Sequence, residues 1–516
     1  MHVIASFAVG FGLLWTVVTW FRKPKYPLPP GPKPLPIIGN VLDMPSVRPW
    51  EKYREWCKQY DSDLVHLDLP GNPAVIVGSV AAATDLFEKR SHNYSDRIRY
   101  VVAEMMGWDF NIVIMPYTAQ WRAHRKLFHQ HFQQSAVDRY IPVQTKYARG
   151  FLSWTLNAPT EAREHARRMI TSIIVSVTYG KEVSGMDDPF VKMAQMGVEG
   201  FSVSMIPGVY WVEFLPFLRH IPSWVPGTTS RKLAEKYRSF VVDTRDKPYA
   251  EVKKSVDDGT AALSLAATMY SDVRTEHGGT AEEAVADETA RNVAGLAYSA
   301  AADTTTFSCE ALLLAFALYP RVQKKAQAEL DRVVGPHRLP DTDDLAQLPY
   351  VRAVVMEAQR WLPIVPFGVP HAAMADDTYE GNWIGKGTVM IPNIWAMLKN
   401  PEEYPDPDDF IPERFINDKG EFRTDVRDPL TMAFGFGRRI CPGKFFAINI
   451  LNLYAASVLH AFEITPGSDE HGKTRKLSTE MMSGLISKPK DVPTGLKPRS
   501  EAVARLIREA AAELEL

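Results

Sequence analysis

The sequence predicts one large domain that is mainly α-helical with a minor β-sheet, an α+β fold. Segments with helical periodicity dominate, strand-like runs are few and short, and residues 49–497 contain no internal repeat or long low-complexity linker. A chain of 516 residues can bury a large core. Its 59 basic and 61 acidic residues are nearly balanced, which argues against nucleic-acid binding.

Helices are expected where apolar residues recur every three or four positions, and strands where β-branched and apolar residues cluster in short runs. The expected helices cover residues 121–132, 137–156, 161–179, 288–318, 320–334 and 345–361. The expected strands cover residues 64–69, 74–77 and 388–391. Residues 257–288 are polar and rich in Gly, Ala and Thr, so we expect a loop between helices there.

The N-terminus predicts a membrane anchor. Residues 3–21 form a run of 19 residues without a charge, long enough to cross a bilayer as a helix. Arg22, Lys23 and Lys25 follow at once, so the positive-inside rule places the following domain on the cytosolic side. A cleaved signal peptide is the alternative, but its basic residues would precede the apolar run.

The chain therefore divides into four expected segments. A transmembrane signal anchor covers residues 1–21, and a basic, proline-rich hinge covers residues 22–40. The prolines of the hinge favour a stiff extended segment, although a ligand for a proline-reading module would look the same. The main domain covers residues 41–498, and an amphipathic tail covers residues 499–516. In the tail, one apolar face is formed by Val503, Leu506, Ile507 and Ala510.

Cysteine use points to a reducing compartment. The three cysteines, Cys57, Cys309 and Cys441, are widely spaced and match no zinc-site or disulfide pattern. Cys309 lies in an apolar helical run and is expected to be a small buried hydrophobe, whereas Cys57 has no evident role.

Cys441 has a different setting, a glycine-rich loop at residues 434–443. It follows Arg438 and Arg439 and precedes an apolar run that can form a helix. Glycines let the backbone approach a flat macrocycle, nearby N–H groups stabilise a thiolate, and Arg439 can pair with a haem propionate. The pattern thus suits a thiolate ligand of haem iron. A glycine-rich turn around a structural cysteine is the alternative.

This loop resembles the haem-ligand signature of the cytochrome P-450 family, F-x-x-G-x-R-x-C-x-G. Every fixed position is matched, by Phe434, Gly437, Arg439, Cys441 and Gly443. The resemblance extends over nearly the whole chain and is closest to fungal microsomal members. It implies the cytochrome P-450 fold, and heme b whose iron takes the Cys441 thiolate as its axial ligand.

Further motifs follow in the order that the family has them. The resemblance implies that Trp121 and Arg125, four apart on a helix, donate to haem propionates, and that His371 contacts a propionate. An amphipathic surface helix is the alternative for the first pair.

The resemblance also implies a structural ionic triad of Glu357, Arg360 and Arg414. The E-x-x-R pattern alone carries little weight, because Glu164/Arg167 and three further pairs match it and are expected to be ordinary surface pairs. What singles out Glu357 and Arg360 is that a P-E-R-F segment and the cysteine loop follow them.

Asp303 and Thr304 lie inside a long alanine-rich helix, where burying an acid and a hydroxyl is costly unless they have partners or a task. The segment resembles the A-G-x-D-T-T pattern of the family, which implies proton delivery during oxygen activation. The alternative is a helix bend made by hydroxyls that bond to the i−4 carbonyl. The glycine of the family pattern is Ala301 here, which puts the geometry of the oxygen groove in doubt.

The expected function follows from the resemblance. A membrane-anchored monooxygenase would insert one oxygen atom of O₂ into a hydrophobic small molecule of secondary metabolism. No dinucleotide or flavin motif is evident, so electrons from NADPH would come through a separate NADPH–cytochrome reductase, with cytochrome b5 as a second donor. The expected location is the endoplasmic reticulum membrane, with a single span and the catalytic domain in the cytosol.

A basic docking face for these donors is expected at Arg122, Arg125, Arg438 and Lys444. The substrate pocket should draw on residues 105–115, 295–305, 364–369 and 481–486. Two rival functions remain: a haem-thiolate isomerase or peroxygenase that needs no reductase, and a non-enzymatic membrane protein that binds haem or a sterol.

Overall fold

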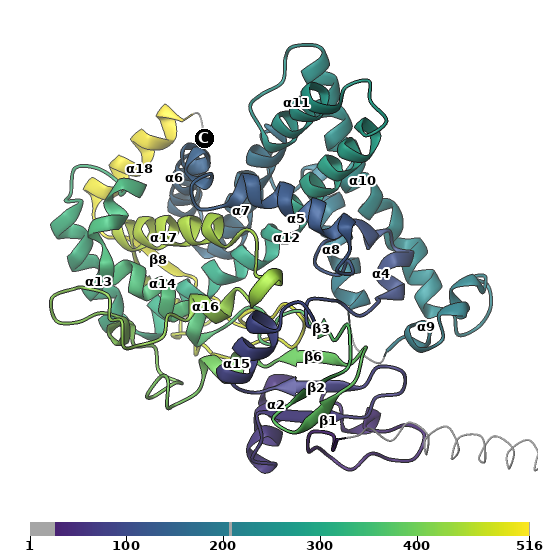
Figure 1. Ribbon diagram of the computed structural model, residues 1–516. Helices are drawn as coiled ribbons and strands as arrows, with labels where there is room; N and C mark the ends of the chain where they lie inside the picture. The colour runs from purple at the N-terminus through teal and green to yellow at the C-terminus, as the bar shows by residue number, and fades with distance from the viewer. Residues whose placement is uncertain (1–25, 206–208, 515–516) are drawn as a thin grey trace, which may run out of the picture.

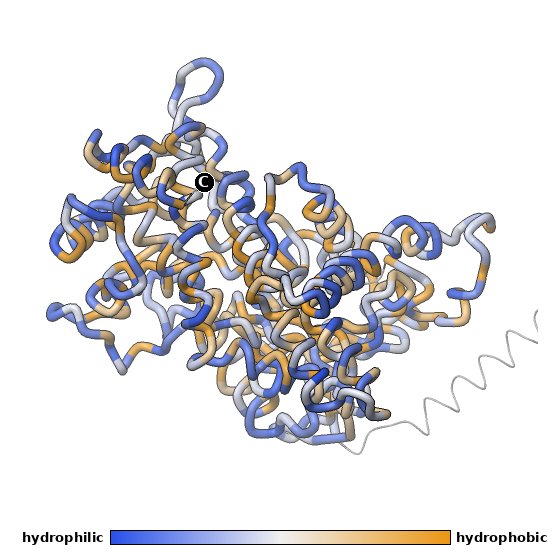
Figure 2. The backbone as a smooth tube through the Cα atoms, turned by 90° about the horizontal axis from the view of Figure 1, so that it is seen from above, coloured by the Kyte–Doolittle hydropathy of each residue, from blue (hydrophilic) through white to orange (hydrophobic). Residues whose placement is uncertain are grey.

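The computed structural model describes residues 26–205 and 209–514. The expected anchor at residues 1–21 and the start of the hinge at residues 22–25 lie outside the described residues. Helices make up most of the molecule, and a small sheet with α2 forms one end of it (Figure 1). Figure 2 shows that hydrophobic segments concentrate in the interior and that many outer loops are hydrophilic. This arrangement confirms the expected mainly helical α+β fold.

The helices span most of the chain. Their bounds are α2 (Pro49–Gln59), α3 (Val80–Ala83), α4 (Val101–Met105), α5 (Ala119–Phe132), α6 (Ile141–Asn157), α7 (Ala162–Tyr179), α8 (Pro189–Ser204), α9 (Trp211–Phe214), α10 (Thr229–Asp257), α11 (Leu265–His277), α12 (Glu283–Leu318), α13 (Pro320–Val333), α14 (Pro349–Trp361), α15 (Ile394–Leu398), α16 (Leu430–Ala433), α17 (Lys444–Ala461) and α18 (Glu501–Glu513). All six expected helices are present, with ends that differ by a few residues.

The main sheet has the strand order β1-β2-β6-β3. Its strands are β1 (Leu64–Leu67), β2 (Ala74–Val77), β6 (Val389–Pro392) and β3 (His371–Ala372). β2 runs parallel to β6, and both outer pairs are antiparallel. The remaining strands form two hairpin-like pairs, β4 (Asp377–Tyr379) with β5 (Asn382–Ile384) and β7 (Phe462–Thr465) with β8 (Gly495–Pro498).

The long helix α12 organises the helical body. It packs against α5, α7, α10, α11, α14 and α17, and most of its second half is buried. Within the described residues it is the one helix long and apolar enough to cross a membrane. However, 72% of its apolar 18-residue stretch is buried inside the protein, as expected for a core helix. A hydrogen bond of 3.1 Å between the Asn292 amide and His124 links α12 to α5.

The expectation of a loop at residues 257–288 is wrong, because α11 lies within that range. Ser264 caps the helix by accepting from the Ala267 amide. Leu265, Met269 and Val273 recur at helical spacing and are buried, and α11 packs on α12. The polar exposed face of this helix concealed its apolar stripe.

The C-terminal tail forms α18, which docks on α6. Val503, Ala504, Ile507 and Ala511 are buried, and Leu506 and Ala510 pack partly against the core. Arg499, just before the helix, forms two hydrogen bonds of 2.8 and 2.6 Å with Asp331 on α13. The tail is therefore part of the folded domain as far as residue 514.

Replacing Ile507 should test this docking. Ile507→Ala removes a fully packed side chain and should lower the free energy of unfolding by about 2–5 kcal/mol. Arg508→Ala, on the exposed face of the same helix, should change it by about 0.5 kcal/mol or less. Urea unfolding followed by circular dichroism measures both values. Equal effects of the two substitutions would show that α18 does not pack on the body.

Candidate active site

A cavity of about 310 Å³ lies at the centre of the helical body. One wall is the middle of α12, and the opposite wall is the loop at residues 433–443 that carries Cys441. α5, α7 and α8 contribute further side chains, together with the segments after α14 and before β8. Residues far apart in the sequence thus converge on one enclosed space.

The loop that presents Cys441 is shaped by its glycines. Gly435 and Gly437 adopt positive φ angles of 79° and 55°, which favour glycine, and a Cβ atom on Gly437 would collide with the Phe87 carbonyl oxygen. The Cys441 amide donates to the Phe434 carbonyl at 2.8 Å and closes the loop. Gly443 then begins α17. Of the fixed motif positions, Phe434, Arg439, Cys441 and Gly443 line the cavity, whereas Gly437 packs against Phe87 behind it.

The Cys441 thiol faces the cavity and is remote from bulk solvent. Burial raises its pKa, whereas the Gly443 amide, which hydrogen-bonds to the sulfur, and the charges of Arg125 and Lys444 act in the opposite direction. A thiolate at this position would therefore be stabilised by the start of α17 and by a cation from α5.

Three arginines line the cavity without an ion-pair partner among the described residues: Arg97, Arg125 and Arg439. Burial lowers the pKa of each, and the neighbouring Arg97 lowers that of Arg439 further. Arg97 was not expected from the sequence, since it belongs to no motif. Buried cations are normally paired. This cluster is therefore suited to an anionic ligand.

Backbone carbonyls hold two of these guanidinium groups in place. Arg97 donates to Val113 at 2.8 Å and to the two residues before His371. Arg439 donates to the carbonyls of Ser95, Ile112 and Met115 at 2.7–2.9 Å. The Arg125 guanidinium has no hydrogen-bond partner in the described part of the chain.

The other two expected propionate contacts have partners of their own. The single donor of Trp121 bonds to the Ile112 carbonyl at 3.1 Å, and Arg439 lies over its ring. His371 Nδ1 donates to the Tyr94 carbonyl at 2.7 Å, and its ring packs on Phe87. Burial and the charge of Arg97 lower the pKa of His371 well below its ordinary value, so the ring is neutral. Of the two, only His371 keeps an unused nitrogen, Nε2.

Asp303 and Thr304 both line the cavity from α12. Asp303 forms an ion pair of 2.8 Å with Arg167 on α7, and each of these side chains is about one quarter exposed. Arg167 was expected to form an ordinary surface pair with Glu164, and its pairing with Asp303 corrects that expectation. The Thr304 hydroxyl donates to the Ala300 carbonyl at 3.0 Å, as in the alternative interpretation of this segment.

All four segments expected to form the pocket contribute to it. They supply Trp108, Asn111, Ile112 and Val113; residues 296–305 except Tyr298 and Ala302; Ile364, Val365, Gly368 and Val369; and Leu485 and Ile486. α7 and α8 add Ile174, Val177, Val198 and Phe201, which the sequence did not single out. The walls above Cys441 are largely apolar.

A buried acid fixes the loop that carries Leu485 and Ile486. Glu310 on α12 is 1% exposed and pairs with Arg163 on α7 at 3.0 Å. Arg163 also donates to the Pro489 carbonyl at 3.1 Å. Burial raises the pKa of Glu310, and Arg163 opposes the shift. The pair thus connects α12, α7 and the pocket loop.

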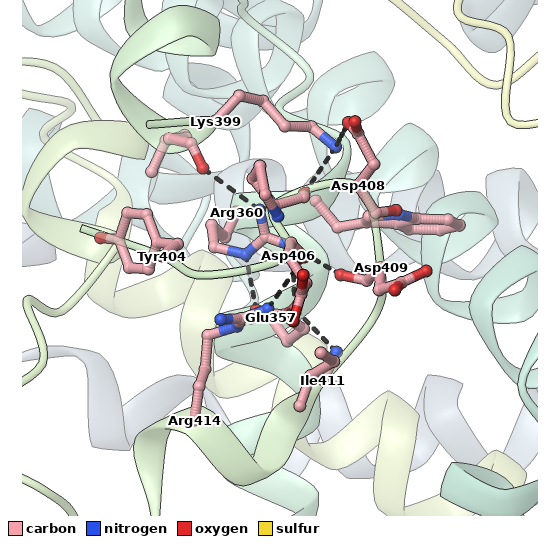
Figure 3. A network of polar contacts seen from close by, with 12 residues as sticks. Glu357, Arg360, Lys399, Tyr404, Asp406, Asp408, Asp409, Ile411 and Arg414 are labelled. Carbon is pink, nitrogen blue, oxygen red and sulfur yellow. Dashed lines mark hydrogen bonds and ion pairs between the residues drawn. The ribbon is translucent and has the colours of Figure 1, made fainter. Parts of the chain in front are cut away.

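Figure 3 shows the network around Glu357. Arg360 forms two hydrogen bonds of 2.7 and 2.8 Å with the carboxylate, and both side chains are fully buried. Arg414 donates to the same carboxylate at 3.2 Å. The Ile411 amide donates to it at 2.8 Å. The three residues of the expected triad therefore form one paired and hydrogen-bonded unit.

The arginines of this unit hold the segment at residues 405–409 through its carbonyls. Arg360 donates to the Asp409 carbonyl (Figure 3). It also donates to the Pro407 carbonyl, and Arg414 donates to the Pro405 carbonyl. Burial lowers the pKa of the nearby Lys399 to about 8, and its ammonium donates to Pro407. This network fixes α14 against the chain that leads to the cysteine loop.

The expected basic docking face is only partly external. Arg122 and Arg438 are exposed and both lie over the ring of Tyr117. Lys444 is half-buried at the start of α17, and Arg125 faces the cavity. Arg122, Arg438 and Lys444 are therefore the members left for a surface contact.

Cys309 is fully buried in α12, as expected.

The residues present fit haem. A cluster of three buried or half-buried arginines without ion-pair partners among the described residues matches two carboxylates, and a cysteine sulfur lines the same cavity. Gly435 and Gly443 leave open space beside that sulfur, which side chains at these positions would fill. The groups are brought together by the segment before α4, by α5 and by the cysteine loop. No group of three or more His, Cys, Asp or Glu suited to a metal ion occurs among the described residues, and Cys441 is the one cysteine among the described residues that line the cavity.

Comparisons with known proteins agree with this chemistry. A family model described as Cytochrome P450 matches residues 29–493. Cytochrome P450 monooxygenase ple1 of Rhodocybe pseudopiperita is 39% identical over 488 residues, which cover 94% of this chain and 92% of the relative. Cytochrome P450 monooxygenase COX2 of Coprinopsis cinerea is 36% identical over 511 residues, with coverages of 99% and 96%. Cytochrome P450 monooxygenase 208 of Postia placenta is 38% identical over 497 residues, with coverages of 96% and 95%.

The Glu357 unit should be essential for stability. Glu357→Ala leaves Arg360 buried without a counterion and should lower the free energy of unfolding by about 3–5 kcal/mol. Glu235→Ala, which removes the exposed partner of Arg231 on α10, is the matched control and should have little effect. Thermal unfolding of both variants gives the comparison. A Glu357→Ala protein as stable as the control would refute the structural role.

Proposed function

The chain belongs to the cytochrome P450 family and is a monooxygenase, and we propose that it inserts one oxygen atom of O₂ into a hydrophobic secondary metabolite. The observation that carries the proposal is that Cys441, Asp303 and Thr304 line one largely apolar cavity. Such walls suit a terpenoid, polyketide, alkaloid or fatty acid better than a charged metabolite.

Haem b would be held between the cysteine loop and α12. Cys441 would supply the thiolate, and Arg97, Arg125 and Arg439 would neutralise the two carboxylates. His371 would present its Nε2 to the same region, whereas the only donor of Trp121 is already used. When bound, thiolate-ligated haem supplies the activation of O₂ and the cleavage of its O–O bond.

Asp303 and Thr304 would deliver protons to the reacting centre. Arg167 holds Asp303 at the border between the cavity and solvent, since both side chains are partly exposed. Thr304 uses its proton on the Ala300 carbonyl, which leaves its oxygen free to accept from water or from an acid. Asp303 would take up protons from solvent and release them to water in the cavity, and the Thr304 oxygen would hold that water by accepting a hydrogen bond from it. Arg167 acts as a positioning residue in this path.

The enzyme would work on the endoplasmic reticulum membrane with its catalytic domain in the cytosol. The apolar run at residues 3–21 would be the single span. Large exposed hydrophobic residues support a membrane contact near α9, where Trp211, Phe217 and Trp224 are 75%, 65% and 80% exposed. Such a contact would let a hydrophobic substrate enter from the lipid phase.

Electrons would come from NADPH through a separate NADPH–cytochrome reductase, with cytochrome b5 as a second donor. Arg122, Arg438 and Lys444 lie near the cysteine loop and supply positive charge for an acidic partner surface. A peroxide-dependent enzyme without a reductase is the alternative outcome. Turnover with peroxide, but not with NADPH and reductase, would establish that alternative.

The ligand role of Cys441 can be tested by absorption spectroscopy. The reduced protein with carbon monoxide should show the red-shifted Soret band of thiolate-ligated haem, and Cys441→Ser should abolish it. Cys57→Ser, in α2, is the matched control and should keep the band. A band that survives in Cys441→Ser would refute the assignment.

The proton path can be tested by the coupling of NADPH use to product. Thr304→Ala should keep the carbon monoxide band but lower product formed per NADPH by about tenfold or more, with the electrons recovered as hydrogen peroxide. Thr306→Ala removes the same kind of hydroxyl–carbonyl bond outside the cavity and should leave coupling unchanged. Equal coupling in the Thr304→Ala and wild-type proteins would exclude the path.

A further inference from the structure

Asn111 is a polar residue in the cavity wall whose side chain has an unused hydrogen-bond donor. Asn111 follows the short turn Trp108–Phe110, lines the cavity and is 4% exposed. Its side-chain oxygen accepts from the Val113 amide at 2.9 Å, which fixes the orientation of the amide group. Its Nδ2 has no hydrogen-bond partner among the described residues.

The backbone around Asn111 is fully bonded and holds the side chain in place. Its amide donates to the Trp108 carbonyl at 2.9 Å, and its carbonyl accepts from Ile114 and Met115. The next carbonyl, that of Ile112, is held by Trp121 and Arg439. Asn111 therefore cannot easily turn away to find another partner.

A second unused donor lies in the same turn. The indole nitrogen of Trp108 is buried and without a partner in the described part of the chain. Its ring stacks on Phe110 at 5.5 Å and meets the edge of Phe201 at 5.2 Å. The Trp108 nitrogen is fully covered by protein, so the Asn111 Nδ2 is the donor of this turn that a ligand in the cavity can reach. An unpaired buried donor destabilises a fold, so such donors commonly serve a ligand.

We propose that Asn111 donates a hydrogen bond to an oxygen that the substrate already carries, a carbonyl or hydroxyl oxygen. This inference rests on the proposed function and narrows the substrate class to hydrophobic molecules with at least one acceptor oxygen. The reaction that supplies the substrate must therefore leave such an oxygen in place.

The alternative partner for Asn111 is a haem carboxylate, because Arg97 and Arg439 bind the backbone close to it. These two possibilities differ in what a loss of the donor would change. Loss of a substrate contact changes discrimination between ligands and leaves haem bound. Loss of a haem contact weakens haem retention for every ligand.

Ligand binding to the haem-loaded full chain, read from the spin-state change of the haem spectrum, provides the test. The probes are two pairs of matched size, cyclododecane with cyclododecanone and adamantane with 2-adamantanone. An apolar wall without a donor would favour the hydrocarbon in each pair. The wild-type protein should instead bind each ketone about five- to tenfold more tightly than its hydrocarbon.

Three variants complete the experiment. Asn111→Asp keeps the acceptor for the Val113 amide and removes the donor, so the ketone preference should fall to about onefold or below. Asn111→Leu also removes the donor and should have the same effect, and it replaces the aspartate variant if that variant folds poorly. Val198→Ala, in the apolar wall formed by α8, should alter both members of a pair alike and preserve their ratio.

The experiment can distinguish failure of the Asn111 inference from failure of the proposed function. Absence of the carbon monoxide band in the wild-type protein would reject the haem–thiolate site itself. With that band present, no ketone preference in the wild type, or a preference unchanged in both Asn111 variants, would overturn the inference. Loss of haem from both Asn111 variants would also overturn it, because Asn111 would then serve the cofactor.

Discussion

Unpaired positive charge inside the protein is the constraint on which the rest of the structure depends. Arg97, Arg125 and Arg439 face one cavity with no carboxylate partner in the described chain. Such charges destabilise the fold unless an anion compensates them. Arg439 of the cysteine loop binds carbonyls of the segment before α5, and Arg97 binds one carbonyl of that segment and two just before β3. These cations therefore join three separate parts of the chain.

The buried charges around Glu357 differ from those of the cavity because they are paired with one another. Glu357 binds Arg360 and Arg414, and these arginines fix the chain that leads toward Cys441. The Glu357 unit, in which the charges are paired, thus supports the fold. The three cavity arginines have no paired charge in the described chain and are suited to bind a ligand. This contrast explains why similar residue types serve stability in one place and binding in the other.

Local patterns explain what could be predicted from the sequence. The glycines lie within a few residues of Cys441, so their motif can be recognised in the sequence. The long apolar segment around Asp303 and Thr304 predicted a buried helix. Arg97 was not predicted, and Arg167 was assigned to a pair with Glu164, because their partners lie far along the chain: Val369 and Pro370 for Arg97, and Asp303 for Arg167. Likewise, the sequence alone did not show that the Asn111 side chain lines the cavity, because this depends on how the turn at residues 108–110 packs in the fold. Helix α11 was not predicted because polar residues alternate with its buried ones and the flanking sequence is polar.

A crystal structure of the haem-loaded protein tests the central claim most directly. The account predicts a bond between the iron and the Cys441 sulfur, with the haem carboxylates against Arg97, Arg125 and Arg439. Iron bound by another residue, or carboxylates directed away from these arginines, would contradict it.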